Sequence, residues 1–481
     1  MGKKNQAGMS NLLLALLLVL VAYNCAAAAG AGGGGGGRRG HHQFEAEAVD
    51  SEGKDEQQQK LFMLQEEKEV VRTEAGVIKV VSGGSDRLMK SLQKQPLIDI
   101  GFITMEPKSL LLPHYLDSTL VLFVRLGDAR IGHIYKDELV ERDLKAGDIY
   151  TIEAGSAFYL VNTAGGQRLR IICSIVRASP TIGSNPFQPF FIGGGKHPAS
   201  VLAGFDFKTL STAFNVSGRE LGELLGANLS GPILPLSDSQ RPANAWSGFL
   251  DLKKEERVAL LKRAADFEAP VDREGEGWTW LFRKLMSPLM SSNDDATDPY
   301  NLYESKPDFS NDYGWSMAVD ENDYSPLKLP DVTVYLVNLT AGSMMAPHIN
   351  PRATEYGVVL RGTGEVQVVF PNGTLAMKAE VKEGDVFLVP RFFPFCQIAS
   401  LNGPFEFFGF TTSARDNQPQ FLVGEGSVMQ LLRGRELAKA LGLSEKRLGE
   451  LLDAQSLSTI LPSAKAAPRR LEEGEVLRMM I

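Results

Sequence analysis

The sequence is poor in the side chains that build disulfide frameworks and metal clusters. It has three cysteines and six histidines in 481 residues, and His41 and His42 are adjacent. Three cysteines are too few for a disulfide framework. Cys173 and Cys396, which lie in the body of the chain, are expected to be buried thiols, and a bond between them stays open. Six histidines leave little room for several metal sites.

Basic charge and long apolar runs are also scarce. The formal net charge is −8 and the pI is about 5.5. A nucleic-acid-binding protein needs a basic stripe to neutralise phosphates, and because the sequence has none, nucleic acid is not an expected partner. No segment is apolar for long enough to cross a bilayer about 30 Å thick, so no transmembrane segment is expected. The 43% of apolar residues is ordinary for globular domains.

The first 28 residues have the pattern of a secretory signal peptide. Lys3 and Lys4 provide a positive start, Leu12–Ala22 is an apolar run too short for a membrane helix, and small residues follow over Cys25–Gly30. We therefore predict a signal peptide over 1–28 and entry into the secretory pathway.

A polar and glycine-rich leader is expected over 29–90. Six glycines run from Gly32 to Gly37, and Ser51–Lys60 is polar. Such sequence loses much conformational entropy on ordering and has few apolar groups to offset that loss. We predict that the leader is disordered.

Short strand patterns fill two stretches of the body. Leu120–Leu126 and Leu169–Val176 are apolar or β-branched, and Asp331–Leu339 and Glu365–Phe370 follow in the second stretch. Asn372-Gly373 is typical of a hairpin turn. Several short strands at close spacing favour an antiparallel sandwich or barrel. The fold class is therefore predicted to be mainly β.

Helical segments follow each β-rich stretch, and they repeat. Phe214–Leu225 (FNVSGRELGELL) resembles Leu441–Leu452 (LGLSEKRLGELL), and the same offset aligns Ile233–Pro235 with Ile460–Pro462. The repeat predicts two copies of an antiparallel β-domain followed by a helical arm, packed about a pseudo-two-fold axis. Another helix is predicted over Glu255–Phe267, between the copies.

The second β-rich stretch resembles the cupin superfamily. Gly342–Gly362 reads G-x5-H-x-N-x4-E-x6-G, close to the first cupin motif G-x5-H-x-H-x(3,4)-E-x6-G, and Gly384–Pro390 is similar to the start of the second motif. The resemblance implies a small antiparallel jelly-roll barrel. In metal-bearing cupins, the histidines and the glutamate of the motifs converge on one ion.

The ligand positions of that site are largely replaced in the second copy. His348 and Glu355 are kept, but Asn350 stands at the place of the second histidine and Phe395 at the place of the last. An amide is a weak ligand and a phenyl ring is none. We therefore predict no catalytic residue, no metal and no cofactor, with His348, Asn350 and Glu355 as residual weak metal candidates.

The first copy departs further from the motif. His114 remains, while the other places fall at Leu116, Leu120 and Phe158. Such side chains each contribute roughly 1.5–3 kcal/mol when buried, so both interiors are predicted to be packed. His348 and Glu355 are interpreted as a hydrogen-bonded pair at a pocket mouth. A weak site completed by Cys396 is the alternative, although strand alternation points Cys396 away from Phe395.

The order of segments resembles the vicilins, which are 7S globulin seed storage proteins and double cupins. Pro347–Asn350, Pro299–Tyr303 and Ala353–Glu355 are similar to vicilin stretches, and the resemblance covers roughly 95–465. The domains are predicted as an N-terminal cupin with its arm (91–240), a linker with a helical insert (241–325), a C-terminal cupin with its arm (326–465) and a tail (466–481).

This resemblance implies a nutrient reservoir rather than an enzyme, a homotrimer, and the protein storage vacuole as destination, with secretion to the outside as the alternative. The leucines predicted at trimer contacts, with packing against the subunit's own barrel as the alternative, are Leu221, Leu224, Leu225, Leu441, Leu448, Leu451 and Leu452. Glycosylation candidates are Asn215, Asn228, Asn338 and Asn372. Two alternative functions stay open: a small-molecule or sugar-binding bicupin associated with membranes, and a metal-dependent cupin enzyme.

Overall fold

The computed structural model describes residues 60–82, 98–136, 138–177, 187–195, 197–236, 298–412, 415 and 417–462. All of them belong to one compact unit, Glu56–Ile481. The predicted signal peptide, most of the leader, the helix predicted over Glu255–Phe267 and the tail lie outside these residues. Within the described ranges, no helix combines the length and the apolar character that crossing a membrane requires.

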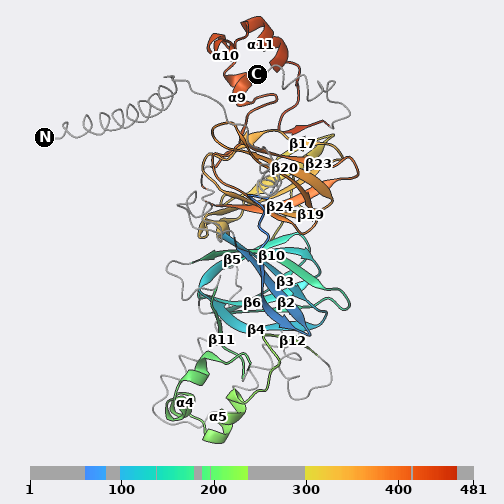
Figure 1. Ribbon diagram of the computed structural model, residues 1–481. Coiled ribbons are helices and arrows are strands. Elements are labelled where there is room, and N and C mark those ends of the chain that lie inside the picture. The colour runs from blue at the N-terminus through green and yellow to red at the C-terminus, as the bar shows by residue number, and fades with distance from the viewer. Residues whose placement is uncertain are drawn as a thin grey trace, which may run out of the picture. The chain divides into compact units, whose positions relative to one another are not determined.

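The first barrel is built from two antiparallel sheets (Figure 1). One sheet has the order β1-β2-β3-β10-β5-β8-β13, and the other has the order β11-β4-β9-β6-β7 with β12 added on β4. The strands are β1 (Glu67–Thr73), β2 (Gly76–Ser82), β3 (Ile98–Met105), β4 (Ser109–Leu116), β5 (Ser118–Leu126), β6 (Ala129–Tyr135), β7 (Glu138–Leu144), β8 (Asp148–Ile152), β9 (Phe158–Asn162), β10 (Leu169–Arg177), β11 (Pro189–Phe191), β12 (Ile233–Pro235) and β13 (Tyr300–Asn301).

The second barrel repeats this plan. One sheet has the order β14-β15-β16-β24-β19-β22, and the other has the order β21-β20-β23-β17-β26, with β18 pairing β23 and β25. The strands are β14 (Phe309–Asn311), β15 (Gly314–Val319), β16 (Val332–Leu339), β17 (Met344–Met345), β18 (His348–Ile349), β19 (Glu355–Arg361), β20 (Thr363–Val369), β21 (Leu375–Lys382), β22 (Val386–Val389), β23 (Phe395–Ala399), β24 (Phe405–Thr412), β25 (Gln420–Phe421) and β26 (Ile460–Leu461). The 3₁₀ helix η2 (Ser325–Lys328) precedes β16. The predicted mainly β bicupin is confirmed.

Each barrel carries a helical arm, as the repeat predicts (Figure 1). The first arm is η1 (Val201–Gly204), α4 (Phe207–Phe214) and α5 (Gly218–Leu225), and the second is α9 (Val428–Leu431), α10 (Arg435–Ala440) and α11 (Glu445–Leu452). The repeated segments begin their helices at equivalent serines: Ser217 accepts from Glu220 N, and Ser444 accepts from Arg447 N. Each serine satisfies an amide that the helix leaves without an internal partner.

The two barrels share a continuous apolar contact, called the seam below. Phe123 of β5 stacks on Phe408 of β24, with ring centroids 4.0 Å apart and 13° between the planes. Ile98, Ile100 and Ile172 belong to the same buried cluster as the interior of the second barrel. The interior of the first barrel forms a separate cluster of aliphatic and aromatic side chains. The seam therefore joins the two halves by the same kind of burial that fills each barrel.

The prediction of a disordered leader to residue 90 is wrong for residues 60–82. Residues 60–66, called the strap segment here, lie on the second barrel, where Phe62 is fully buried. Leu64 N donates to Val386 O and Leu388 N donates to Phe62 O, both at 2.9 Å, so the strap pairs with the edge strand β22. β1 and β2 then form a hairpin on the first barrel. The charged residues of β1 face solvent, so the composition of this segment did not distinguish the strand from a disordered leader.

The predicted start of the second cupin at residue 326 is also wrong. β14 and β15 precede it and pair with each other and with β16, so the second barrel begins near residue 309. β13 pairs with β8 and extends the first barrel instead. Short strands from the predicted linker thus complete sheets of both barrels, because an edge strand gains hydrogen bonds from any extended segment beside it.

Candidate functional site

The interior of the second barrel holds its remaining histidine between two phenyl rings. His348 on β18 pairs with Phe395 of β23 and with Phe421 of β25. The imidazole centroid is 4.0 Å from the ring of Phe395 and 5.1 Å from that of Phe421. Nδ1 donates a hydrogen bond of 2.8 Å to the carbonyl of Ala346. The ring is therefore held by packing on its faces and by the backbone at one edge.

The first barrel repeats this arrangement with its own residues. His114 on β4 lies 4.3 Å from the ring of Phe158 and 5.3 Å from that of Phe191, measured between centroids. Nδ1 donates 2.7 Å to the carbonyl of Leu112. The same aromatic pair and the same backbone bond occur in both halves, so the histidines share one structural role.

Burial keeps both imidazoles neutral. It lowers the pKa of His114 and of His348 from the ordinary 6.5 to about 4, against the smaller opposite effect of the backbone hydrogen bond. As the pH falls, the unfolded chain protonates these histidines near pH 6.5, before the folded protein does. The free energy of unfolding therefore falls between pH 6.5 and pH 4, and the contribution of the neutral rings is complete only above pH 6.5. At neutral pH the proton sits on Nδ1, because a carbonyl can only accept.

Glu355 lies buried in a network of amides. Asn350 Nδ2 donates 2.8 Å to one carboxylate oxygen, and Gln397 Nε2 donates 3.2 Å to the other. Asn417 Nδ2 donates 3.3 Å to Asn350 Oδ1. Burial raises the pKa of Glu355 from 4.5 to about 7, and the hydrogen bonds from Asn350 and Gln397 act in the opposite direction. This carboxyl group is half-protonated near neutral pH.

The interpretation of His348 and Glu355 as a hydrogen-bonded pair is wrong. In the described part of the chain, no hydrogen bond joins the two side chains: His348 is bonded to Ala346 and Glu355 to the amides. Each group is instead bonded to a partner of its own. Asn350 does not act as a substitute ligand, because its Oδ1, the amide atom that could bind a metal, accepts from Asn417 Nδ2.

The donors present do not fit a metal ion. The imidazole packs between two rings, the carboxylate is hydrogen-bonded by two amides, and Phe395 offers no donor. Among the described residues, no three His, Cys, Asp or Glu side chains gather as a metal site would require. Interior residues of this barrel therefore supply packing and hydrogen bonds.

Both described cysteines are free and buried. Cys396 lies on β23 beside Phe395 and is not part of the Glu355 network, which agrees with the predicted alternation. Burial raises the pKa of Cys396 to about 11 and that of Cys173 to about 12. Thiols so reluctant to ionise are poor nucleophiles and poor metal ligands.

The predicted trimer-contact leucines divide into three groups by their burial. Leu221 and Leu448, at equivalent places in the two arms, are buried within the protein, whereas Leu224 and Leu451 are 52% and 46% exposed. Leu441 is exposed as well, and Leu225 and Leu452 are half-buried. For Leu221 and Leu448 the structure therefore favours the alternative of packing within the subunit, because their side chains are already buried in a single copy.

The predicted glycosylation sites differ in their surroundings. Asn215, Asn228 and Asn372 are exposed, and Asn338 is half-buried on β16. Asn215 ends α4 in the left-handed conformation, and Asn372 lies in the hairpin turn after β20.

Several residues that contact His114, His348 or Glu355 were not expected from the sequence. Phe191, Phe421 and Gln397 were not singled out, although a repeat pointed to the two phenylalanines. QPFFI at Gln188–Ile192 and QPQFL at Gln418–Leu422 are similar segments that place Phe191 and Phe421 at equivalent positions. No comparable signal marks Gln397, which reaches Glu355 from a strand 42 positions away.

Replacing Glu355 by glutamine is expected to remove a pH dependence of stability. The raised pKa means that the native carboxyl keeps a proton between pH 4.5 and 7 that the unfolded chain loses. The protonated Glu355 carboxyl group therefore makes its full contribution to the free energy of unfolding below pH 4.5, and this contribution is lost as the pH rises through 7. We expect Glu355→Gln to exceed the wild type in free energy of unfolding by about 2–3 kcal/mol at pH 8 but not at pH 4, measured by urea unfolding.

The exposed Glu153→Gln serves as the control for this measurement and should show no such trend. The histidines titrate in the wild type and in the variant alike, so their pH-dependent contribution to stability cancels in the difference between the two. An advantage of Glu355→Gln that is equal at both pH values would contradict the expectation.

The sequence and the fold of this chain are similar to those of known plant proteins. A family model described as Cupin matches residues 300–448. A vicilin-like seed storage protein of Arabidopsis thaliana is 48% identical over 427 residues, which cover 86% of this chain and 82% of that protein. The structure of hazelnut vicilin (Corylus avellana) matches with a TM-score of 0.66 at 23% identity, covering 84% of this chain and 99% of the other. That of vicilin from Capsicum annuum matches with a TM-score of 0.67 at 22% identity, covering 85% and 100%.

Proposed function

This chain belongs to the vicilin-like seed storage proteins and is a nutrient reservoir. From that premise we propose that it has no catalytic activity. We further propose that it forms a homotrimer and is stored in the storage vacuole. The observation that carries the absence of catalysis is the aromatic pair around the histidine that each barrel keeps from the cupin motif, His114 and His348.

The side chains inside the barrels support this proposal by what they can and cannot do. A catalytic base must reach a proton on a substrate, and a nucleophile must be activated by such a base. His348 is neutral and enclosed, Glu355 is occupied by amides, and the cysteines are buried thiols. All of these groups are buried.

The homotrimer is proposed from the exposed apolar faces of the arms. Leu224 and Phe207 on the first arm and Leu431 and Leu451 on the second are exposed in the protomer. When each first arm docks on the second arm of the next copy, a head-to-tail contact is formed that closes into a ring under three-fold symmetry. Such faces are rare on monomeric proteins because burying them is favourable.

The storage vacuole is proposed as the destination because a signal-peptide pattern precedes the body, with secretion to the outside as the alternative. The exposed Asn372 is the sequon best placed for glycosylation on this route, because it lies at a hairpin turn. Asn215 lies between α4 and α5, beside the proposed docking face, and is expected to stay unmodified.

The reservoir role is tested by following the protein through the life of the seed. We expect it to accumulate during maturation and to be degraded on germination, as quantified with an antibody against the two-barrel body. A protein that persists unchanged through germination would count against storage. Metal analysis of the dialysed protein tests the absence of catalysis separately, because one tightly held transition-metal ion per chain would overturn that part.

A further inference from the structure

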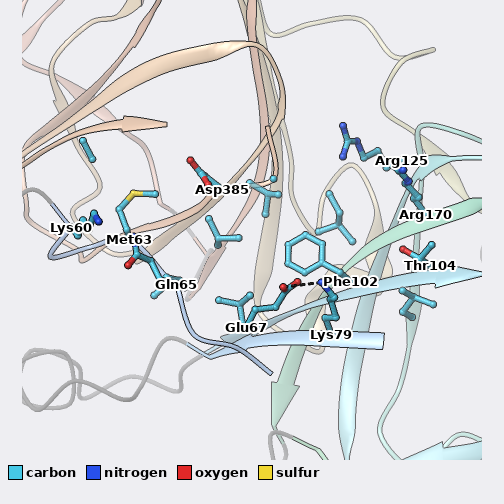
Figure 2. Close-up of a pocket in the computed structure, with 18 of the residues that line it drawn as sticks. Lys60, Met63, Gln65, Glu67, Lys79, Phe102, Thr104, Arg125, Arg170 and Asp385 are labelled. Carbon is cyan, nitrogen blue, oxygen red and sulfur yellow. Dashed lines mark hydrogen bonds and ion pairs between the residues drawn. The ribbon is translucent and has the colours of Figure 1, made fainter. Parts of the chain in front are cut away.

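A cavity of about 920 Å³ lies between the two barrels, beside the seam and outside both barrel interiors (Figure 2). Strands β2, β3, β5 and β10 of the first barrel form one wall. The strap segment and the strands β19, β20, β21 and β22 of the second barrel form the other, and Glu67 of β1 also lines the cavity. This volume falls in the range of small-molecule binding sites.

The wall from the first barrel combines an apolar centre with cations. The strand register places Lys79, Phe102 and Ile172 in one row across the sheet. The next row on the same face carries Thr104 and Arg170, which are also direct partners. Phe102, Thr104 and Arg170 all line the cavity. Neighbours across a sheet are about 5 Å apart, so the two rows form one surface.

A β-bulge adds a second guanidinium to this wall. The register of β5 and β10 shifts between Arg170 and Ile171, so Arg125 is the extra residue on its strand and lines the cavity. Arg125 Nη2 donates 2.5 Å to Leu360 O and 2.6 Å to Glu383 Oε1, which fixes it across the seam. Figure 2 shows Arg125 and Arg170 close together on this wall.

Three of the cations that line the cavity, Lys79, Arg125 and Lys378, are paired with carboxylates. Lys79 Nζ is 2.9 Å from Glu67 Oε2, and Lys378 Nζ is 3.6 Å from Glu365 Oε2. For Arg170, the structure shows no side-chain hydrogen bond or ion pair with any residue in the described ranges. Arg170 is exposed, so an anion that enters the cavity can reach the N–H donors of its guanidinium.

The facing wall determines which end of a bound molecule lies at Arg170 and which lies along the strap segment. The strap segment contributes Met63 and Leu64, and β22 contributes Val386, which extend the apolar surface from Phe102. The carboxylates of Glu380 and Asp385 lie on this side and repel a second negative charge. An anionic head is thus favoured at Arg170 and an apolar body along the strap.

We propose that this inter-barrel cavity binds an amphiphilic monocarboxylate, a molecule of the fatty-acid class. The carboxylate pairs with Arg170, in the bidentate geometry that guanidinium groups favour, and hydrogen-bonds to Thr104. The hydrocarbon chain lies over Phe102 and against Met63 and Leu64. Neither barrel interior takes part, so the site is independent of the filled cupin centres.

Titration of the full chain with 11-(dansylamino)undecanoic acid tests this assignment. We expect saturable binding with a blue shift of the dansyl emission, and displacement by dodecanoate. Dodecanol and dodecyltrimethylammonium, which lack the carboxylate, should not displace the probe. Displacement by all three alike, or the absence of saturable binding, would overturn the proposal.

Two variants locate the probe in the cavity. Arg170→Gln should weaken binding about tenfold, the usual effect of losing a hydrogen bond to a charged group. Thr104→Trp should abolish binding by filling the space above the sheet, with circular dichroism confirming the fold. Arg435→Gln, which removes an exposed charge on α10, should bind as the wild type does. Unchanged affinity in both cavity variants would place the probe on another surface and reject the site.

Discussion

Replacing Phe408 by alanine is expected to lower the free energy of unfolding by about 3–5 kcal/mol. The ring is fully buried, stacks on Phe123 across the seam and meets Phe410 edge-on at 5.0 Å. Removing it leaves a cavity where the two barrels join, and the neighbouring strands can close it only in part. Guanidinium unfolding followed by circular dichroism measures the loss.

A double-mutant cycle with Phe123→Ala separates the contact across the seam from the cavity. The two changes should be coupled by about 0.5–1.5 kcal/mol, the usual worth of a stacked aromatic pair. Phe392→Ala is the control, because its ring is 53% exposed, and it should change stability by less than about 0.5 kcal/mol. A cost of Phe408→Ala no larger than that of the control would mean that the seam does not stabilise the protein.

The double variant Leu224→Glu with Leu451→Glu is expected to convert the proposed trimer into monomers. Each leucine occupies the equivalent exposed place on its arm, and burying such a side chain is worth about 1.5–3 kcal/mol. A carboxylate in a docked arm loses that gain and adds the cost of burying a charge. Sedimentation equilibrium should show the mass falling from three chains to one.

The choice of leucines makes this experiment interpretable. Leu221 and Leu448 are buried in the protomer, so changing them would unfold an arm rather than expose an interface. Leu401→Glu is the matched control, since that leucine is 60% exposed and lies outside both arms. A double variant that remains trimeric, or a wild type that sediments as a monomer, would rule out docking through these faces.

Strand patterns and helix starts were readable from neighbouring residues. The run at Leu120–Leu126 lies within β5, and Ser444, which lies in the repeated segment Leu441–Leu452, caps α11. Phe395 is buried, as its place in the cupin motif predicted. The hairpin of β1 and β2 was missed because β1 is an edge strand with charged, exposed residues, which composition does not distinguish from a leader.

The partners of the histidines could not be read in the same way. His348 meets Phe421, 73 positions further along the chain, and Glu355 meets Gln397 rather than the histidine of its own motif. Strand alternation says which face a side chain occupies, but the register of distant strands decides which side chain it touches.

By itself, the sequence determined the two-fold repeat, the β-rich class, the capped helices and the replacement of imidazoles by hydrocarbon, because these depend on local periodicity and residue type. The tertiary structure alone decided the aromatic enclosure of His114 and His348, the isolation of Glu355 among amides and the cavity beside Arg170. Those features come from contacts between segments far apart in the chain, whose pairing follows from the packing of whole sheets.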